Sequence, residues 1–265
     1  MLKIKDLKKV FPDGTEALHS VNFEVKKGEF VVILGPSGSG KTTLLQCING
    51  LSSTSKGSIY LDNRCISYNN PTIARQNISM IFQNFNLVQN ISVINNVLSG
   101  MLDKCHPFAS LFYIFSKKQK IRALECLDEV GLISKAYSRT DKLSGGQQQR
   151  VGIARALSRQ PLMILADEPV ASLDPLIAYQ VLSLLKEISS LQGITVVCNL
   201  HQVDLALRFS DRIIGLTEGK IIVNELTKSL DPEYIHNIYG SHNKEIYYGV
   251  NNNNEKKFNN VPLLS

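Results

Sequence analysis

Residues 35–43 have the sequence Gly-Pro-Ser-Gly-Ser-Gly-Lys-Thr-Thr, and this stretch decides the fold of the chain. Its glycines and its Lys-Thr pair have the spacing of a phosphate-binding loop. Glycines let backbone N–H groups approach a polyphosphate without a Cβ in the way. The lysine would place its charge on the β- and γ-phosphates, and the first threonine would offer its hydroxyl to Mg²⁺. The predicted nucleotide-binding residues are Gly35, Pro36, Ser37, Gly38, Ser39, Gly40, Lys41, Thr42 and Thr43.

The segments on either side of this loop have the patterns of a strand and a helix. Residues 30–34 form a short apolar run, which predicts a buried parallel strand ending at the loop. Residues 42–49 predict a helix whose N-terminal dipole faces the phosphates. Because the motif lies between a strand and a helix, nucleotide binding is favoured over the alternative of a structural glycine-rich turn.

Composition and charge exclude some classes of protein. The chain has 265 residues, is 43% hydrophobic and carries a net charge of +6. This length can bury a sizeable core. Basic residues never run beyond pairs, which argues against a dedicated nucleic-acid surface. The charge fits either a mildly basic surface near an anionic membrane or ordinary solubility.

Cysteine usage and the N-terminus predict a cytosolic protein. The five cysteines are odd in number and form no Cys-x-x-Cys pair, so we expect reduced thiols. The first residues lack an apolar signal core, and no apolar run approaches the length of a membrane span. We therefore expect a chain that neither crosses a membrane nor carries a cleaved signal. The cysteines are Cys47, Cys65, Cys105, Cys126 and Cys198.

The remaining apolar runs predict alternating strands and helices, as in an α/β protein. We expect a helical character from about residue 91 to residue 142, and a polar, poorly ordered tail at residues 241–265. The aromatic stretch 107–115 either packs locally or forms a docking surface. The other predicted strands are 2–7, 21–25, 57–61, 78–82, 162–166, 194–198, 212–216 and 220–223, and the other predicted helices are 117–130, 143–160 and 175–191.

Two consecutive acids, Asp167 and Glu168, follow the apolar run at 162–166. A phosphate-binding loop needs such an acidic strand to hydrolyse a nucleotide. Asp167 would hold Mg²⁺ through water, and Glu168 would orient or deprotonate the attacking water. The alternative is a surface carboxylate pair at the end of a strand.

The segment Leu143-Ser-Gly-Gly-Gln147 is the most specific motif in the chain. With the phosphate-binding loop and the acidic strand, it makes residues 1–225 resemble the ATP-binding subunits of ABC transporters. By this resemblance, the segment would contact the γ-phosphate of ATP bound to the other subunit of a homodimer. The nucleotide-binding residues of the segment would be Ser144, Gly145, Gly146 and Gln147.

Other family positions are also filled. Gln83 matches a glutamine that senses nucleotide and the membrane partner, and Asp174 lies in the loop that crosses the dimer interface. His201 matches a histidine that holds the γ-phosphate, and Phe11 falls where a ring stacks on adenine. Taken alone, a histidine at position 201 would more often be structural, and the other motifs reverse this preference; a core phenylalanine would look the same as Phe11. The resemblance implies Glu168, His201 and Gln83 as catalytic residues, and Thr42, Gln83 and Asp167 as Mg²⁺ ligands.

Three finer segments resemble the ATPase subunits of phosphonate importers. They are Phe11-Pro-Asp-Gly-Thr-Glu-Ala-Leu18, Glu168-Pro-Val-Ala-Ser-Leu-Asp-Pro175 and Asn199-Leu-His-Gln-Val-Asp-Leu205, and the aromatic stretch 108–115 shares this resemblance. A RecA-like α/β core is implied, with a small antiparallel β subdomain and a helical subdomain at about 85–160, within an ATPase domain spanning 1–240.

The resemblance also implies cofactors, partners and a location. ATP and Mg²⁺ would bind to a homodimer attached to transmembrane permease subunits at the cytoplasmic face of the inner membrane. An extracytoplasmic solute-binding protein would act indirectly, and nucleic acid would have no part. The alternatives are an importer of another small solute or an ABC ATPase of DNA repair or the ribosome. The absence of a long insert between Lys41 and Asp167 argues against DNA-repair ATPases, and the single cassette argues against ribosomal factors.

Overall fold

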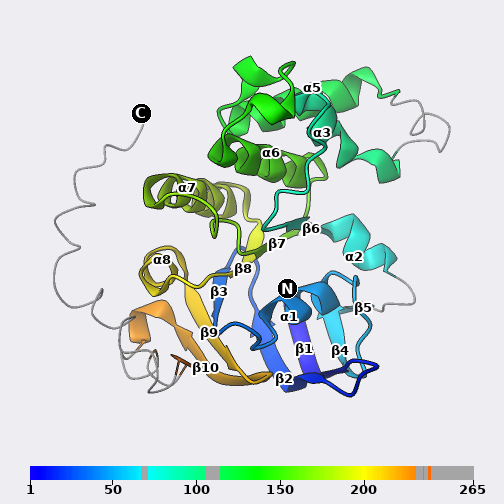
Figure 1. Ribbon diagram of the computed structural model, residues 1–265. Helices are drawn as coiled ribbons and strands as arrows, with labels where there is room; N and C mark the ends of the chain where they lie inside the picture. The colour runs from blue at the N-terminus through cyan, green and yellow to red at the C-terminus, as the bar shows by residue number, and fades with distance from the viewer. Residues whose placement is uncertain (67–70, 105–113, 231–234, 236–237, 240–265) are drawn as a thin grey trace.

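The structure is a computed structural model that describes residues 1–66, 71–104, 114–230, 235 and 238–239. Its centre is a six-stranded sheet in the order β10-β9-β3-β8-β7-β6 (Figure 1). Its strands are β3 (Phe30–Leu34), β6 (Ile78–Ile81), β7 (Met163–Asp167), β8 (Thr195–Asn199), β9 (Arg212–Thr217) and β10 (Lys220–Leu226). All neighbouring pairs are parallel except β9 and β10, which form an antiparallel hairpin.

A second sheet of four strands has the order β2-β1-β4-β5 and is antiparallel throughout. Its strands are β1 (Leu2–Val10), β2 (Glu16–Val25), β4 (Lys56–Leu61) and β5 (Arg64–Ile66). A bond from the His19 N–H to the Gly219 carbonyl ties β2 to the β9–β10 hairpin. The small antiparallel sheet therefore lies beside the β9–β10 edge of the large sheet.

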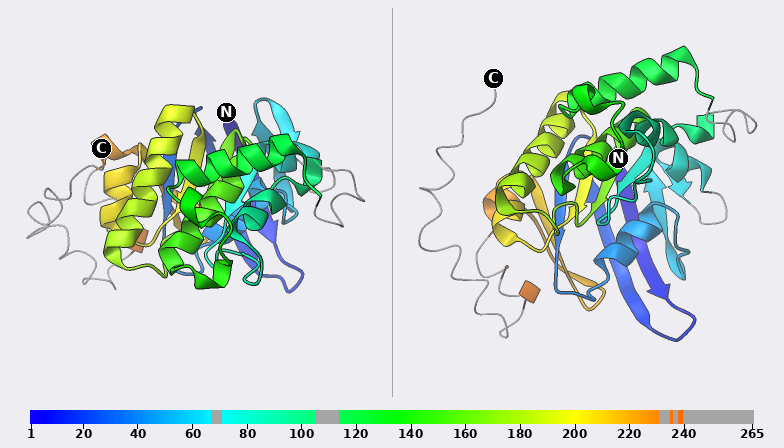
Figure 2. Two further views of the ribbon diagram at one scale, coloured as in Figure 1. Left: turned by 90° about the horizontal axis from the view of Figure 1, so that it is seen from above. Right: turned by 45° about the horizontal axis from the view of Figure 1, so that its top comes forward.

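The helices divide between the two faces of the large sheet. Figure 1 and the right-hand view of Figure 2 show α3, α5 and α6 gathered at the opposite end of the molecule from the antiparallel sheet. α1 instead lies beside the antiparallel sheet (Figure 1). The helices are α1 (Lys41–Ile48), α2 (Thr72–Asn77), α3 (Val93–Ser99), α5 (Lys117–Glu129), α6 (Gly145–Ser158), α7 (Pro175–Gln192) and α8 (Val203–Phe209).

Hydrophobic side chains fill two separate cores, one on each face of the large sheet. Successive residues of a strand point to opposite faces. Val31 and Ile33 of β3 accordingly join the core that includes α1, while Phe30, Val32 and Leu34 join the core beneath the other helices. Because both faces are covered, β3 is an unbroken apolar run, as expected for a parallel strand.

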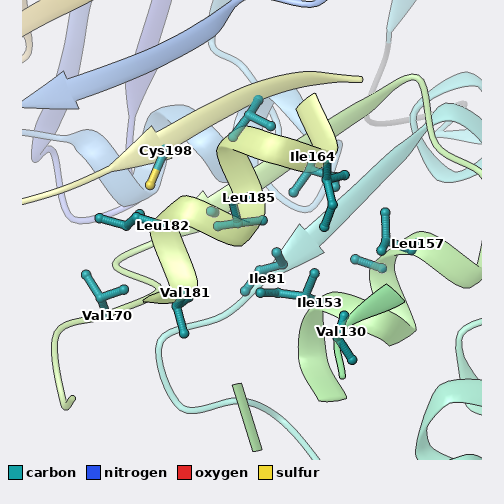
Figure 3. Close-up of a cluster of buried hydrophobic side chains, with 14 of the residues drawn as sticks. Ile81, Val130, Ile153, Leu157, Ile164, Val170, Val181, Leu182, Leu185 and Cys198 are labelled. Atoms are coloured by element: carbon teal, nitrogen blue, oxygen red, sulfur yellow. The ribbon is translucent and has the colours of Figure 1, made fainter. Parts of the chain in front are cut away.

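Figure 3 shows part of the second core. Val181, Leu182 and Leu185 of α7 lie in the same cluster as Ile164 of β7 and Cys198 of β8. All five side chains are fully buried. This packing holds the carboxyl ends of β7 and β8 beside each other, and ligands of parallel α/β sheets bind at this edge.

The predicted fold class is confirmed, with differences at the level of single elements. β1 and β2 extend closer to their connecting turn than the apolar runs indicated. The predicted helical region contains α3, α5 and short 3-10 turns. β5, α2 and α8 were not predicted, because each is too short to show a periodic apolar pattern. The polar tail at 241–265 lies outside the described residues.

The cysteines agree with the expectation of free thiols as far as the structure describes them. Cys47, Cys126 and Cys198 are buried, Cys65 is exposed, and all four are unpaired. Cys105 lies outside the described residues. Burial raises the pKa of the Cys47 thiol to about 11, so this thiol stays protonated at neutral pH. No helix in the described ranges is long and apolar enough to span a membrane.

The docking hypothesis for the aromatic stretch is wrong at Phe115. Its side chain is 6% exposed and belongs to the second core, whereas the neighbouring Ile114 is 64% exposed. Ser116 and Gln119 form a capping box that starts α5 directly after Phe115. Residues 108–113 of the stretch lie outside the described residues.

Replacement of Phe115 by serine should lower the free energy of unfolding by about 3–5 kcal/mol, because it removes a buried ring and leaves a cavity. Chemical denaturation of Phe115→Ser measures this loss. The matched control is Ile114→Ser, where the side chain is exposed and little stability should be lost. Equal stability of the two variants would contradict the core assignment.

Candidate nucleotide-binding and hydrolysis site

The phosphate-binding loop connects β3 to α1 and depends on its glycines for close packing. A Cβ at Gly35 would lie 2.0 Å from the Leu216 carbonyl oxygen, and one at Gly40 would lie 2.5 Å from the Ala17 carbonyl oxygen. Gly38 and Gly40 also have positive φ angles, +78° and +101°. The loop is therefore clamped between β9 and β2, and larger residues at Gly35 or Gly40 would displace the backbone.

Lys41 begins α1 and is held over the loop. Its side chain is almost fully buried, and its Nζ donates to the carbonyl oxygens of Gly35 and Pro36, both at 2.9 Å. Burial lowers the pKa of this amine, while Glu168 and Asp167 oppose the shift. A buried cation bonded only to carbonyl oxygens suits an incoming phosphate, whose charge would give stronger hydrogen bonds.

The structure brings the predicted Mg²⁺ ligands Thr42 and Asp167 together. The Thr42 hydroxyl donates to Asp167 Oδ1 at 3.0 Å, and the Asn199 amide donates to the same oxygen at 2.8 Å. Asp167 and Asn199 end neighbouring strands and are paired in register. Their side chains therefore leave the sheet on the face that carries α1.

The predicted catalytic pair Glu168 and His201 also comes together. His201 Nε2 lies 2.5 Å from Glu168 Oε1. The two residues follow the ends of β7 and β8, so the sheet itself brings them together. Glu168 has a φ of 49°, which is uncommon for a residue with a side chain. Such backbone strain is concentrated at functional sites.

Two predicted residues, Gln83 and Phe11, have no hydrogen bond to this centre among the described residues. Gln83 follows β6, and the register of Ile81 with Ala166 places it at the same edge of the sheet as Glu168. No hydrogen bond joins Gln83 to Asp167 or Thr42 in the part of the chain that the structure describes. Phe11 follows β1, and its ring lies 5.0 Å from the Lys9 ammonium in a cation–π contact.

The segment at 143–147 leads into α6, and local interactions account for its residue types. Ser144 caps the helix, and its side chain accepts from the Gln147 N–H in a capping box. A Cβ at Gly146 would lie 2.3 Å from Ile177, so α7 requires glycine there. Asp174 caps α7 by accepting from the Ile177 N–H. The close approach of Gly146 to Ile177 places the N-termini of α6 and α7 side by side.

Residues 144–147 do not touch the phosphate-binding loop of their own chain. Within the described ranges, no hydrogen bond or ion pair joins them to residues 35–43. Figure 1 shows α6 and α1 on separate sides of the large sheet. This separation is compatible with the expectation that residues 144–147 meet a nucleotide bound to a second copy of the chain.

Arg155 was not predicted, yet it connects α6 to the segment that follows Gln83. Its guanidinium donates to the carbonyl oxygens of Phe85 at 2.8 Å and Asn86 at 2.5 Å. Both acceptor residues have positive φ angles, 57° and 48°. The conformation of this segment thus depends on a cation from the helix that Ser144 begins. No sequence pattern around Arg155 could have indicated this contact.

Asn199 is a second functional candidate that sequence reasoning did not single out. It is fully buried and contacts Asp167 directly. The signal in the sequence was a polar residue on a strand face that is otherwise buried. It comes two residues after Val197, which belongs to the hydrophobic core that includes α1. In the sequence Asn199 is only one member of a longer family segment, which assigns it no role of its own.

The donor set fits Mg²⁺. The described residues contain no cluster of three His, Cys, Asp or Glu side chains that could hold a metal. Mg²⁺ needs none, because it is usually bound by one or two carboxylates with substrate phosphates and waters. Thr42 and Asp167 provide oxygen ligands, and the buried Ser39 hydroxyl and Asn199 amide oxygen have no hydrogen-bond partner within the described part of the chain. Unpaired buried polar atoms of this kind indicate a missing ligand or water.

Comparisons of sequence and structure with known proteins identify one family. The family model "ABC transporter" matches residues 18–171. A phosphonates import ATP-binding protein of Thiobacillus denitrificans is 48% identical, over 90% of this chain and 92% of the relative. One from Staphylococcus saprophyticus is 47% identical, over 94% of this chain and 99% of the relative. A solved dimeric ATP-binding cassette with ADP and Pi has a TM-score of 0.73 and 37% identity, covering 87% of this chain and all of that chain.

Fold and site together define a nucleotide-binding cassette, in which a phosphate-binding loop faces an acidic strand end. The chain belongs to the ABC transporter family. A further solved cassette, in its ADP conformation, has a TM-score of 0.80 and 30% identity, covering 94% of this chain and 98% of that chain. The predicted family and its nucleotide binding are thereby confirmed.

Proposed function

We propose that the chain hydrolyses ATP to drive the import of a phosphonate or a related phosphorus oxyanion. The observation that carries the proposal is the placement of two residue pairs, Thr42 with Asp167 and Glu168 with His201, at one sheet edge beside Lys41. The choice of phosphonate is supported by nearly full-length relatives named as phosphonates import ATP-binding proteins.

In this mechanism the chain's own groups position ATP and water. Lys41 exchanges its bonds to the loop carbonyls for phosphate oxygens, and Phe11 stacks on the adenine. Thr42 and Asp167, with Gln83, would hold Mg²⁺, which when bound neutralises charge that develops on the phosphates. Glu168 accepts the proton of the attacking water, because its carboxylate lies at the sheet edge next to the phosphate-binding loop.

A second copy of the chain completes the site. Ser144, Gly145 and Gly146 of the partner would face the γ-phosphate, and Asp174 would lie at the interface. The N-terminus of a helix suits this task, because its N–H groups and dipole favour a bound anion. ATP would thus hold two copies together, and hydrolysis would release them.

The proposed setting is the cytoplasmic face of the cell membrane, with the homodimer attached to transmembrane permease subunits. An extracytoplasmic solute-binding protein would deliver the solute, which never touches this chain. The importer of another small solute remains the second candidate, because the residues described above recognise ATP and not the cargo.

Growth distinguishes the two candidates. Deletion of the gene should abolish growth on a phosphonate as sole phosphorus source, and the wild-type chain should restore it. Unchanged growth would overturn the phosphonate assignment.

His201 should be required for hydrolysis and not for folding. His201→Ala should lower the ATPase rate by about 10²–10³-fold, the usual effect of removing one donor to the reacting group. Its melting temperature should hardly change, because the side chain is 42% exposed. The matched control is His19→Ala, another partly exposed histidine next to a glutamate. A large loss of stability, with normal activity per folded molecule, would instead make His201 structural.

A further inference from the structure

Asn199 occupies a position where the strand pattern calls for an apolar residue. It ends β8, and its side chain is fully buried. In the neighbouring strands it is paired in register with Asp167 of β7 and Ile33 of β3. Ile33 and Val197, on the same face, belong to the apolar core around α1. Burial of a polar side chain at the end of this row costs folding free energy unless the side chain is hydrogen-bonded there.

The orientation of the Asn199 amide is fixed by chemistry. A carboxylate only accepts hydrogen bonds, so the amide nitrogen must face Asp167 and the amide oxygen must point elsewhere. The nitrogen lies 2.8 Å from Asp167 Oδ1. The oxygen is buried and has no partner among the described residues.

A second buried asparagine shows what a structural role looks like. Asn96 is also fully buried, and its amide nitrogen donates to the Val88 carbonyl oxygen and the Thr140 hydroxyl. Its amide oxygen accepts from the Val88 N–H. Asn96 is therefore satisfied at both ends, and Asn199 at one end only. The difference points to a ligand or a bound water at the free end of Asn199.

The contacts of Asp167 indicate which ligand this is. Thr42 and Asn199 both donate to Oδ1 of Asp167. If Thr42 turns its hydroxyl oxygen toward a cation, the bond to Asn199 is the one that still orients the carboxylate. Groups that orient a metal ligand in this way commonly raise the metal affinity by about 10–100-fold.

We propose that Asn199 is a positioning residue for the divalent cation of the hydrolysis site. Its amide nitrogen orients Asp167, and its amide oxygen accepts a hydrogen bond from a water on that cation. This inference rests on the proposed function, which places Mg²⁺ between Thr42 and Asp167. It adds a residue beyond those that the motifs predict.

The test measures binding without turnover. In a Glu168→Gln background, the affinity for a fluorescent ATP analogue is measured with Mg²⁺ and with EDTA, and the ratio gives the metal coupling. Asn199→Leu, of similar volume, should reduce this coupling by about 10–100-fold and leave the affinity in EDTA unchanged. The control Asn96→Leu should lower the melting temperature, because three hydrogen bonds are lost, and keep the coupling.

A reference variant separates this inference from the proposed function. Thr42→Ala should abolish the coupling. If Thr42→Ala abolishes it and Asn199→Leu retains the wild-type value, the Asn199 assignment is wrong and the metal site stands. If both variants retain the wild-type value, the metal site and the inference fail together. Should Asn199→Leu not fold, Asn199→Val, a β-branched residue suited to a strand, takes its place with the same outcomes.

Discussion

Replacement of Glu168 by glutamine should reduce ATP hydrolysis by about 10²–10⁴-fold, the usual contribution of a general base. Glutamine keeps the size of the side chain and can still contact His201, but it cannot accept a proton from water. ATP affinity should persist, because Lys41 and Thr42 are unchanged. The closed, ATP-bound dimer should therefore accumulate.

Two measurements check this result, namely steady-state phosphate release and equilibrium ATP binding. The matched control is Glu187→Gln, an exposed glutamate on α7 far from the sheet edge, which should keep its activity. Near-normal turnover of Glu168→Gln would remove Glu168 from the role of base. A loss of ATP binding in the same variant would point to a structural role.

Replacement of Gly145 by aspartate should weaken ATP-dependent dimerisation by at least about 100-fold, because a carboxylate facing the γ-phosphate is a like-charge contact worth several kcal/mol. The fold should tolerate the change. A Cβ at Gly145 would lie 3.4 Å from Leu173, an ordinary contact, and an acid in the first turn suits the dipole of α6.

Analytical ultracentrifugation in the Glu168→Gln background, with and without ATP, measures the dimer. The neutral isostere Gly145→Asn is the control and should dimerise far better than the aspartate variant. Gly146 is unsuitable for this test, because any side chain there clashes with Ile177 and would disturb α7 directly. An undiminished ATP dimer of Gly145→Asp would contradict the composite site.

Those parts of the site that depend on local sequence could be predicted. The phosphate-binding loop follows an apolar run that can only be buried, so β3, the loop and α1 were found together. Asp167 and Thr42 are far apart in sequence, but both follow recognisable strands. The phosphate-binding motif and the acid at a strand end were therefore enough to predict both residues as Mg²⁺ ligands.

The parts that depend on neighbouring strands and helices could not be predicted. The contact of Asn199 with Asp167 needs the order β8-β7 and its register, which no single strand reveals. For Phe115 both local packing and docking stayed open, because aromatic runs without a period do not say which rings are buried. The hydrogen bond from Arg155 to the Phe85 carbonyl likewise depends on how α6 packs. The need for glycine at position 146 depends on the same packing.

The most direct test of the proposed function is uptake of a radiolabelled phosphonate into proteoliposomes. The vesicles would carry a phosphonate permease in their membrane, with the solute-binding protein and the labelled phosphonate outside and with this chain and ATP enclosed. Uptake should require both ATP and the wild-type chain, and Glu168→Gln should reduce it in proportion to its loss of hydrolysis. Uptake at the wild-type rate with Glu168→Gln, or without this chain, would contradict the account.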